Sequence, residues 1–227
     1  QKYITTSYNR NNSSSLSDDF VYDILKDNEG GLWITTYFGG INYSNPNSSN
    51  FTIRHCATES ARGRIISKFH EDKNGDIFIG TDDGGLFIYN PIKDKCHRYT
   101  IDKSNPNLNI HAIWSNDTYL WIGTYSKGLY RINHKTKYVE HIPYFEKDGI
   151  TNESIYSIHE DLSGKIWIGT KTAIWTWTKK HGFIKEKELG YNSDIIAICE
   201  DLKGSIWFAS LNKGILKYTP TTCLLYT

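Results

Sequence analysis

The stretch EDLSGKIWIGT, residues 160–170, contains residue types that could carry out acid/base chemistry on a ring-shaped ligand. Glu160 and Asp161 could form a general acid and base pair. Trp167 could supply an aromatic platform for the ring of the ligand. Taken alone, the stretch therefore permits two interpretations, an active site or a part of the scaffold.

The same stretch recurs along the chain, with full copies at 26–36, 71–81 and 200–210 and a degenerate copy at 115–124. The aligned aromatic residues are 45, 43, 46 and 40 residues apart: Trp33, Phe78, Trp121, Trp167 and Trp207. This period is typical of one four-stranded propeller blade. A catalytic pair is needed only once, so the repetition favours scaffold: the Asp caps a hairpin, the Glu ends a strand, and the Trp packs between blades.

Each repeat has the same predicted elements. An apolar strand precedes the Asp, an Asp-x-x-Gly turn follows, and a second strand such as 166–170 has apolar or small residues on both faces. Two apolar faces suit a sheet packed between neighbouring sheets. A Gly-bearing loop, a third strand, a turn and an outer fourth strand complete the unit. Gly, Thr and β-branched residues crowd every segment, which disfavours helix. The sequence therefore predicts an all-β fold, a β-propeller of four-stranded antiparallel blades.

The repeats predict one partial propeller over residues 1–227. The expected blades occupy about 15–56, 57–102, 103–147, 148–190 and 191–227, and 1–14 is expected to be the outer strand of a preceding blade. One strand plus five blades does not close by sharing a blade between the two ends. We therefore expect a fragment of a larger, seven-bladed ring, with a self-closed five-bladed ring as the alternative. Copies three and four are each one residue short, between Ile113 and Trp121 and between Thr170 and Ala173.

The composition of the chain reduces the number of functional classes that it could belong to. With 38% hydrophobic and 14% aromatic residues the 227-residue chain is globular, and its net charge of +1 gives no reason to expect nucleic acid. Its apolar runs fall far short of the ~20 residues that span a bilayer. Four cysteines without a CxxC pair, and eight histidines without ligand spacing, predict neither metal nor cofactor. Buried free thiols are expected in preference to disulfides.

The repeat pattern apolar-x-x-Ile-x-Glu-Asp-x-x-Gly-x-Ile-Trp-Ile-Gly-Thr-x-x-Gly-Gly-Leu resembles the two-component regulator propeller repeat. The fullest match is FHEDKNGDIFIGTDDGGLFIYNP, residues 69–91, and the resemblance covers nearly the whole chain. Copy three departs from the pattern by losing the Asp-x-x-Gly turn, and copy four has Ala173-Ile174 in place of Gly-Leu. These departures bear on local turns and not on the fold.

The resemblance implies the periplasmic sensor region of an inner-membrane hybrid two-component regulator from a polysaccharide-degrading gut bacterium. In such proteins two seven-bladed propellers precede an immunoglobulin-like domain, a membrane span, a histidine kinase and a receiver, often followed by a helix-turn-helix domain. The usual signal is an oligosaccharide released from a glycan. The expected partners are therefore an oligosaccharide or other small ligand, the second propeller and the immunoglobulin-like domain, in a parent that could form a homodimer. Kinase activity is expected elsewhere in the parent, with no enzyme activity in this region.

Strand direction predicts where a ligand would bind. Strands alternate in direction, so the loop between strands two and three faces the same way as the connection into the next blade. Binding residues usually lie on loops held by a rigid scaffold, and these loops differ between copies. Aromatic side chains would stack on sugar rings, and Arg and Asn would bind hydroxyl or carboxylate groups. The candidate binding residues are Tyr37, Phe38, Arg62, Arg64, Asp82, Asp83, His111, Tyr125, Lys127, Lys171, Tyr191 and Asn192.

Alternatives to this interpretation remain open. The candidate residues could be ordinary solvated loop residues. The region could be a propeller enzyme of the lyase or glycosidase type, since fold alone does not decide function. Such an enzyme should have a single unrepeated cluster of His and carboxylates, and the sequence offers none, nor a GxSxG, P-loop or dinucleotide fingerprint. A passive carbohydrate- or protein-binding scaffold is the second alternative.

Overall fold

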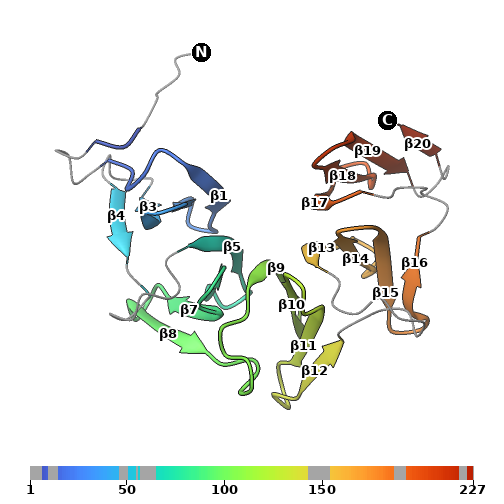
Figure 1. The fold of residues 1–227 in the computed structure, drawn as a ribbon, viewed down its shortest axis with the longest axis horizontal. Coiled ribbons are helices and arrows are strands. Elements are labelled where there is room, and N and C mark those ends of the chain that lie inside the picture. The colour runs from blue at the N-terminus through green and yellow to red at the C-terminus, as the bar shows by residue number, and fades with distance from the viewer. Residues whose placement is uncertain are drawn as a thin grey trace. The chain divides into compact units, whose positions relative to one another are not determined.

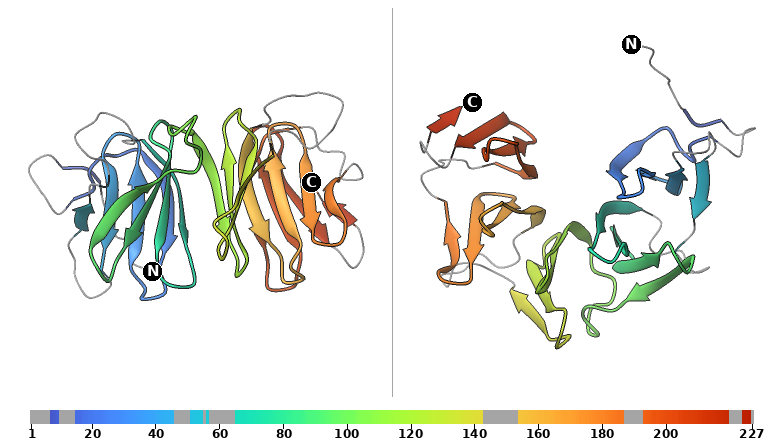
Figure 2. Two further views of the ribbon diagram at one scale, coloured as in Figure 1. Left: turned by 90° about the horizontal axis from the view of Figure 1, so that it is seen from below. Right: turned by 180° about the vertical axis from the view of Figure 1, so that it is seen from behind.

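The computed structural model describes residues 7–9, 15–45, 51–54, 56, 65–142, 154–186, 193–219 and 224–226. In this part of the chain every regular element is a β-strand, and the strands form five antiparallel four-stranded sheets (Figure 1). Within each sheet the strands pair in sequence order. Figure 2 shows the same sheets from two further sides. The prediction of an all-β propeller built from four-stranded blades is confirmed. The number of blades in the complete ring and the way it closes stay predictions.

The chain divides into two compact units, residues 1–110 and 111–227. The first unit contains blades one and two. Their strands are β1 (Val21–Lys26), β2 (Leu32–Thr36), β3 (Gly40–Ser44), β4 (Phe51–Arg54), β5 (Ile66–Glu71), β6 (Ile77–Thr81), β7 (Leu86–Asn90) and β8 (Lys95–Tyr99). Of the segment expected to be a preceding outer strand, 1–14, only residues 7–9 are described; Tyr8 forms an isolated parallel bridge with Leu16.

The second unit contains blades three, four and five, apart from the first residue of β9. Their strands are β9 (Ile110–Ser115), β10 (Tyr119–Thr124), β11 (Leu129–Asn133), β12 (Val139–Ile142), β13 (Ile155–Glu160), β14 (Ile166–Thr170), β15 (Ile174–Thr178), β16 (Gly182–Lys185), β17 (Ile195–Glu200), β18 (Ile206–Ser210), β19 (Gly214–Thr219) and β20 (Leu224–Tyr226).

The core of each unit consists of apolar layers between successive blades. In the first unit Trp33 of β2 packs with Phe69 and Tyr89 of blade two, at ring-centroid distances of 6.4 and 5.3 Å. In the second unit Trp167 packs against Phe208 of blade five in the same way. The repeated aromatic is buried in blades one to four, whereas Trp207 is half-buried. The Trp residues are therefore packing residues, as the repetition indicated.

The repeated Gly before the terminal Thr of the second strand allows neighbouring blades to approach closely. A Cβ atom added to Gly169 of β14 would meet Ser157 Oγ and would lie 2.7 Å from the carbonyl oxygen of Ile195 in β17. Ser157 Oγ in turn donates a 2.9 Å hydrogen bond to that same carbonyl. Blade five is thus attached to blade four through a contact that only a residue without a side chain permits.

The expectation of buried free thiols is wrong. Cys56 and Cys96 form a disulfide with Cα atoms 5.3 Å apart, joining the segment after β4 to β8. The two residues are 40 apart in sequence, close to one blade repeat, so they lie near equivalent outer positions of consecutive blades. Sequence reasoning missed this because neither cysteine lies inside the repeat motif. Cys199 is a free thiol but is exposed on β17, and Cys223 lies outside the described residues.

Candidate ligand-binding loop edge

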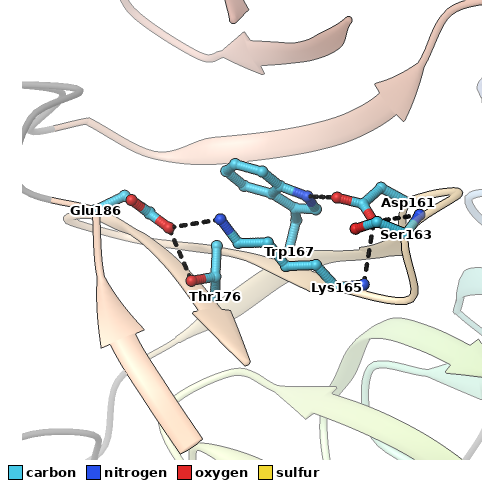
Figure 3. Close-up of polar contacts among 6 residues, drawn as sticks. All are labelled: Asp161, Ser163, Lys165, Trp167, Thr176 and Glu186. Carbon is cyan, nitrogen blue, oxygen red and sulfur yellow. Dashed lines mark hydrogen bonds and ion pairs between the residues drawn. The ribbon is translucent and has the colours of Figure 1, made fainter. Parts of the chain in front are cut away.

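The Glu160-Asp161 pair does not form an acid/base site. Asp161 Oδ1 accepts hydrogen bonds from the backbone N–H groups of Ser163 and Lys165 at 2.9 and 3.0 Å, and Oδ2 accepts one from Trp167 Nε1 at 2.7 Å (Figure 3). Burial raises the pKa of Asp161, but the hydrogen bonds outweigh it and hold the pKa below its usual value. A carboxylate that is ionised and fully used as a turn cap cannot act as a general acid at neutral pH.

The equivalent turns have the same arrangement. The Oδ2 atoms of Asp27 and Asp201 each accept a 2.8 Å hydrogen bond from the indole N–H of Trp33 and Trp207, respectively. Hydrogen bonds from the Trp207 indole and the backbone of Ser205 lower the pKa of Asp201 to about 2. The repeated Asp is therefore a structural cap.

The repeated Glu links neighbouring blades. Glu71 Oε1 accepts from the Asn28 side chain in the turn of blade one at 3.1 Å. Glu200 Oε2 accepts from the backbone N–H of Leu162 in the turn of blade four at 2.8 Å. Glu160 Oε2 accepts from Trp114 Nε1 of blade three at 3.2 Å. The repeated Glu-Asp pair is thus scaffold, and the search for a site moves to the opposite ends of these strands.

At those ends, the loop between strands two and three meets the segment that enters the first strand of the same blade. The first loop residue donates its backbone N–H to the residue preceding or entering the first strand, at 2.9 to 3.2 Å: Tyr37 to Phe20, Asp82 to Ile65, Lys171 to Ser154 and Leu211 to Asp194. The two kinds of connection therefore share one edge of each blade, which we call the loop edge. This geometry is the one that strand direction predicted.

The loop edge of blade one carries four exposed aromatic residues, which we call the aromatic patch: Phe20, Tyr22, Tyr37 and Phe38. Their exposed fractions are 72, 46, 38 and 74%. The Tyr22 and Tyr37 rings are stacked at 6.3 Å with an interplanar angle of 28°, and the Tyr37 and Phe38 rings meet edge to face at 4.6 Å. Aromatic rings can stack on the rings of a ligand, so this group of four rings is a candidate binding surface.

The backbone under the aromatic patch is fixed by Asp18. Its Oδ1 accepts from the N–H of Phe20 at 3.2 Å, and its Oδ2 accepts from the N–H of Phe38 at 2.9 Å. Together with the bond from Tyr37 N–H to the Phe20 carbonyl, these contacts hold both loop segments in a single arrangement. The rings are therefore presented by a rigid support, which lowers the entropy cost of binding.

Tyr22 is directed by an irregularity in strand pairing. The register of β1 against β2 shifts between Val21 and Asp23, which places Tyr22 at a bulge. The same shift occurs at Ser67, Tyr156 and Ile196 in blades two, four and five. Bulges redirect side chains and are frequent next to functional sites. The residue after the first apolar position of each inner strand is therefore a second variable position, beside the loops.

In the second unit, His111, Tyr125 and Tyr156 form a cluster that we call the His111 cluster. The His111 ring lies 5.8 Å from the Tyr125 ring and 5.7 Å from the Tyr156 ring. A hydrogen bond of 3.2 Å from Ser126 N–H to Ser154 Oγ joins the loop of blade three to the entry of blade four. Burial and the nearby charge of Asp194 raise the pKa of Tyr156, so its phenol stays protonated at neutral pH. The cluster offers aromatic faces and hydroxyl groups, which suits a polyhydroxylated ligand.

The structure places the predicted site residues in different surroundings. Tyr37 and Phe38 lie in the aromatic patch, and His111 and Tyr125 lie in the His111 cluster. Lys127 and Lys171 are exposed on their loops, whereas Asp82 and Asp83 are half-buried in the loop of blade two; the structure does not bring these four into either group. Outside the described residues are Arg62, Arg64, Tyr191 and Asn192.

Sequence reasoning missed Phe20, Tyr22 and Tyr156. The signal that could have found the two tyrosines is the alignment of the repeats at the bulge position. That position reads Tyr22, Ser67, His111, Tyr156 and Ile196 and varies as much as the loops do. Phe20 carries no such signal, because its exposure depends on how the entry segment packs.

Among the described residues no group of three or more His, Cys, Asp or Glu side chains is arranged to hold a metal ion. Within the same residues there is also no helix of the length and apolar character needed to cross a membrane.

Residues 15–38, which hold Asp18 and all four rings of the aromatic patch, match the family model of the two-component regulator propeller. This segment is therefore similar to a two-component regulator propeller repeat. The chain is also similar to Histidine kinase P4 of Formosa agariphila, with 27% identity over 138 residues. That similarity covers 58% of this chain but only 10% of the relative. The propeller repeat therefore occurs here in a chain that spans a small part of its curated relative.

Solved structures share the fold at low sequence identity. Extracellular domains of two candidate hybrid two-component systems from B. thetaiotaomicron have TM-scores of 0.79 and 0.74, each with 19% identity. They are matched over 96 and 100% of this chain and 29% of each of theirs. Virginiamycin B lyase from Staphylococcus aureus has a TM-score of 0.72 at 16% identity, over 91% of this chain and 69% of the lyase. The propeller fold is thus common to extracellular domains of candidate two-component systems and to an enzyme, and fold alone does not separate them.

Proposed function

We propose that this region is the extracytoplasmic ligand-sensing propeller of a two-component signalling protein, and that its ligand is an oligosaccharide. The observation that carries the proposal is the aromatic patch, a rigidly supported set of exposed rings inside the segment that matches the family. Tyr22, Tyr37 and Phe38 offer ring faces for the apolar sides of sugars, and the two phenols can donate to hydroxyl oxygens.

The compartment is part of this proposal. The Cys56–Cys96 disulfide supports an oxidising compartment, where such bonds persist. Similarity to extracellular domains of candidate two-component systems agrees with that location. We place the region in the periplasm, as part of an inner-membrane protein whose kinase activity lies outside this chain. A second propeller, an immunoglobulin-like domain and a second copy of the parent are its proposed partners.

Signalling requires that the ligand distinguish two arrangements of the parent. A ligand shifts an equilibrium only to the extent that it binds one arrangement more tightly than the other. Residues from separate segments, such as Phe20 and Tyr37, meet at the loop edge, so a ligand that spans them would favour the arrangement in which the loop edge is accessible. The proposed region therefore acts by binding and performs no chemical step.

A lyase-like activity has weaker support. The likeness to virginiamycin B lyase is a likeness of fold at 16% identity. The acidic residues that could have served as a catalytic pair are turn caps and blade links, with the pKa of Asp201 near 2. In the described residues the structural roles of the repeated Glu and Asp leave them poorly suited to proton transfer.

A thermal-shift screen of the chain against oligosaccharides of several glycan classes tests the proposal. A ligand at 100 times its dissociation constant should stabilise the folded state by about 2.7 kcal/mol. Tyr37→Ala and Phe38→Ala should remove the shift. Tyr138→Ala is the matched control, because Tyr138 is 68% exposed but lies in the turn between β11 and β12, away from the loop edge. A shift that survives both loop-edge substitutions would assign binding to another surface, and no shift with any glycan class would count against carbohydrate sensing.

A further inference from the structure

Blade three departs from the Asp–Trp pairing of blades one, four and five. Its hairpin between β9 and β10 is one residue shorter and is closed by Asn116, whose N–H donates to the Tyr119 carbonyl at 3.0 Å. Asn116 Oδ1 accepts from the backbone N–H groups of Thr118 and Tyr119 at 3.0 and 2.9 Å. The side-chain oxygen that binds the indole in the other blades is therefore missing from this turn.

In the part of the chain that the structure describes, two buried donors of blade three have no hydrogen-bond partner. Trp121 is 0% exposed, and its Nε1 has no hydrogen-bond partner among the described residues. Arg131 pairs directly opposite Trp121 in the sheet, and its side chain is 15% exposed. Its Nε and Nη2 donate to Glu140 Oε2 at 3.0 and 2.5 Å, but within the same part of the chain Nη1 is buried with no partner.

The surroundings of these donors are aromatic. The Arg131 guanidinium carbon lies 4.7 Å from the centre of the Tyr119 ring, 5.1 Å from Trp121 and 4.9 Å from Trp177. The Trp121 and Trp177 rings meet edge to face at 5.0 Å. The guanidinium lies over the faces of these rings, which carry partial negative charge and stabilise its positive charge, so an anion here would be held by the two N–H donors and not by the rings.

Blade five shows which kind of group satisfies the same pair of donors. There Lys217 pairs opposite Trp207, as Arg131 pairs opposite Trp121, and its Nζ lies 4.8 Å above the indole ring. Asp201 Oδ2 lies 2.8 Å from Trp207 Nε1 and 3.8 Å from Lys217 Nζ. One anionic oxygen thus serves both the indole and the cation.

We propose that blade three binds a small inorganic anion, chloride in the simplest case, between Trp121 Nε1 and Arg131 Nη1. Both groups can only donate, so the group that satisfies them must accept. A water molecule would also have to direct its own two hydrogens toward acceptors, whereas a halide only accepts. Glu140 is 40% exposed, so solvent screens much of its charge and a second negative group at the buried end of Arg131 is tolerated.

Diffraction from crystals of the chain grown in sodium bromide, recorded at the bromine absorption edge, tests the site directly. An anomalous peak within contact distance of Trp121 Nε1 and Arg131 Nη1 is expected. The absence of a peak near these two atoms would overturn the proposal. Density there without anomalous signal would also overturn it and would assign the site to a water molecule.

Thermal unfolding gives a second test in solution. At equal ionic strength, the midpoint should be about 2–4 °C higher in sodium chloride than in sodium gluconate, whose anion is too large for the site. Trp121→Phe should abolish this difference; Phe78 occupies the same position in blade two, so the fold accepts the substitution. Trp207→Phe is the control and should keep the difference, because Asp201 already serves that indole. Equal midpoints in both salts would contradict anion binding, and should Trp121→Phe not fold, the bromide experiment on the unaltered chain decides.

Discussion

Asp161 and Trp167 are joined by a 2.7 Å hydrogen bond from the indole Nε1 to the carboxylate Oδ2, which ties an exposed turn to a ring that is 1% exposed. The other carboxylate oxygen caps the turn itself. The same two side chains that suggested chemistry in the sequence therefore form the joint between hairpin and core.

Replacing Asp161 with Ala should lower the free energy of unfolding by about 2 kcal/mol, because it leaves a buried indole N–H and two turn N–H groups without their acceptor. Urea unfolding followed by Trp fluorescence measures the change. Leu162→Ala is the control from the same turn: Leu162 is 89% exposed, so a change below about 0.5 kcal/mol is expected. Equal effects of the two substitutions would show that the Asp161 bonds contribute nothing.

His70 of β5 should make stability depend on pH in a defined range. Burial lowers the pKa of its imidazole to about 4, against 6.5 in the unfolded chain, while the charge of Asp72 opposes the shift. Because the folded pKa is the lower one, the unfolded state takes up the proton first, and stability is lost as pH falls from 6.5 towards 4.

The loss should be on the order of 3 kcal/mol over that range, measured as the free energy of unfolding at pH 7, 5.5 and 4. His70→Gln should flatten the profile, and His181→Gln, at an exposed position in the turn after β15, should not. A profile that is unchanged in His70→Gln would contradict the assignment.

The Cys56–Cys96 disulfide should stabilise the first unit. It links residues 40 apart, and reduction or Cys96→Ser should lower the free energy of unfolding by about 2–4 kcal/mol, because the unfolded chain regains freedom. Unfolding with and without dithiothreitol measures the effect. Cys199→Ser, which removes an exposed free thiol, is the control and should leave the response to dithiothreitol intact.

Sequence periodicity was sufficient to predict the blades because most of them carry the same physical features at nearly the same spacing. The Asp turn cap, the buried aromatic residue and the close-packed Gly169 are all part of the repeated sequence motif. Repetition also identified the Glu-Asp pair as scaffold, a conclusion that a single copy would not have allowed.

The candidate site was only half predictable. Tyr37 and Phe38 were found because the loops stop repeating, but Tyr22 required the strand irregularity that directs its side chain. The disulfide could not be predicted, since its cysteines lie outside the motif and are brought together only by the fold, which places the segment after β4 near β8. Deviations from the repeat, such as the short turn at Asn116, became meaningful only once Trp121 was seen without its acceptor.

Calorimetric titration of the chain with the oligosaccharide selected by the thermal-shift screen measures whether the aromatic patch binds the ligand. Tyr37→Ala should weaken binding at least tenfold, about 1.4 kcal/mol, while Tyr138→Ala should leave the dissociation constant unchanged. Equal affinity in the unaltered chain and in Tyr37→Ala would contradict the assignment of the aromatic patch as the sensing surface.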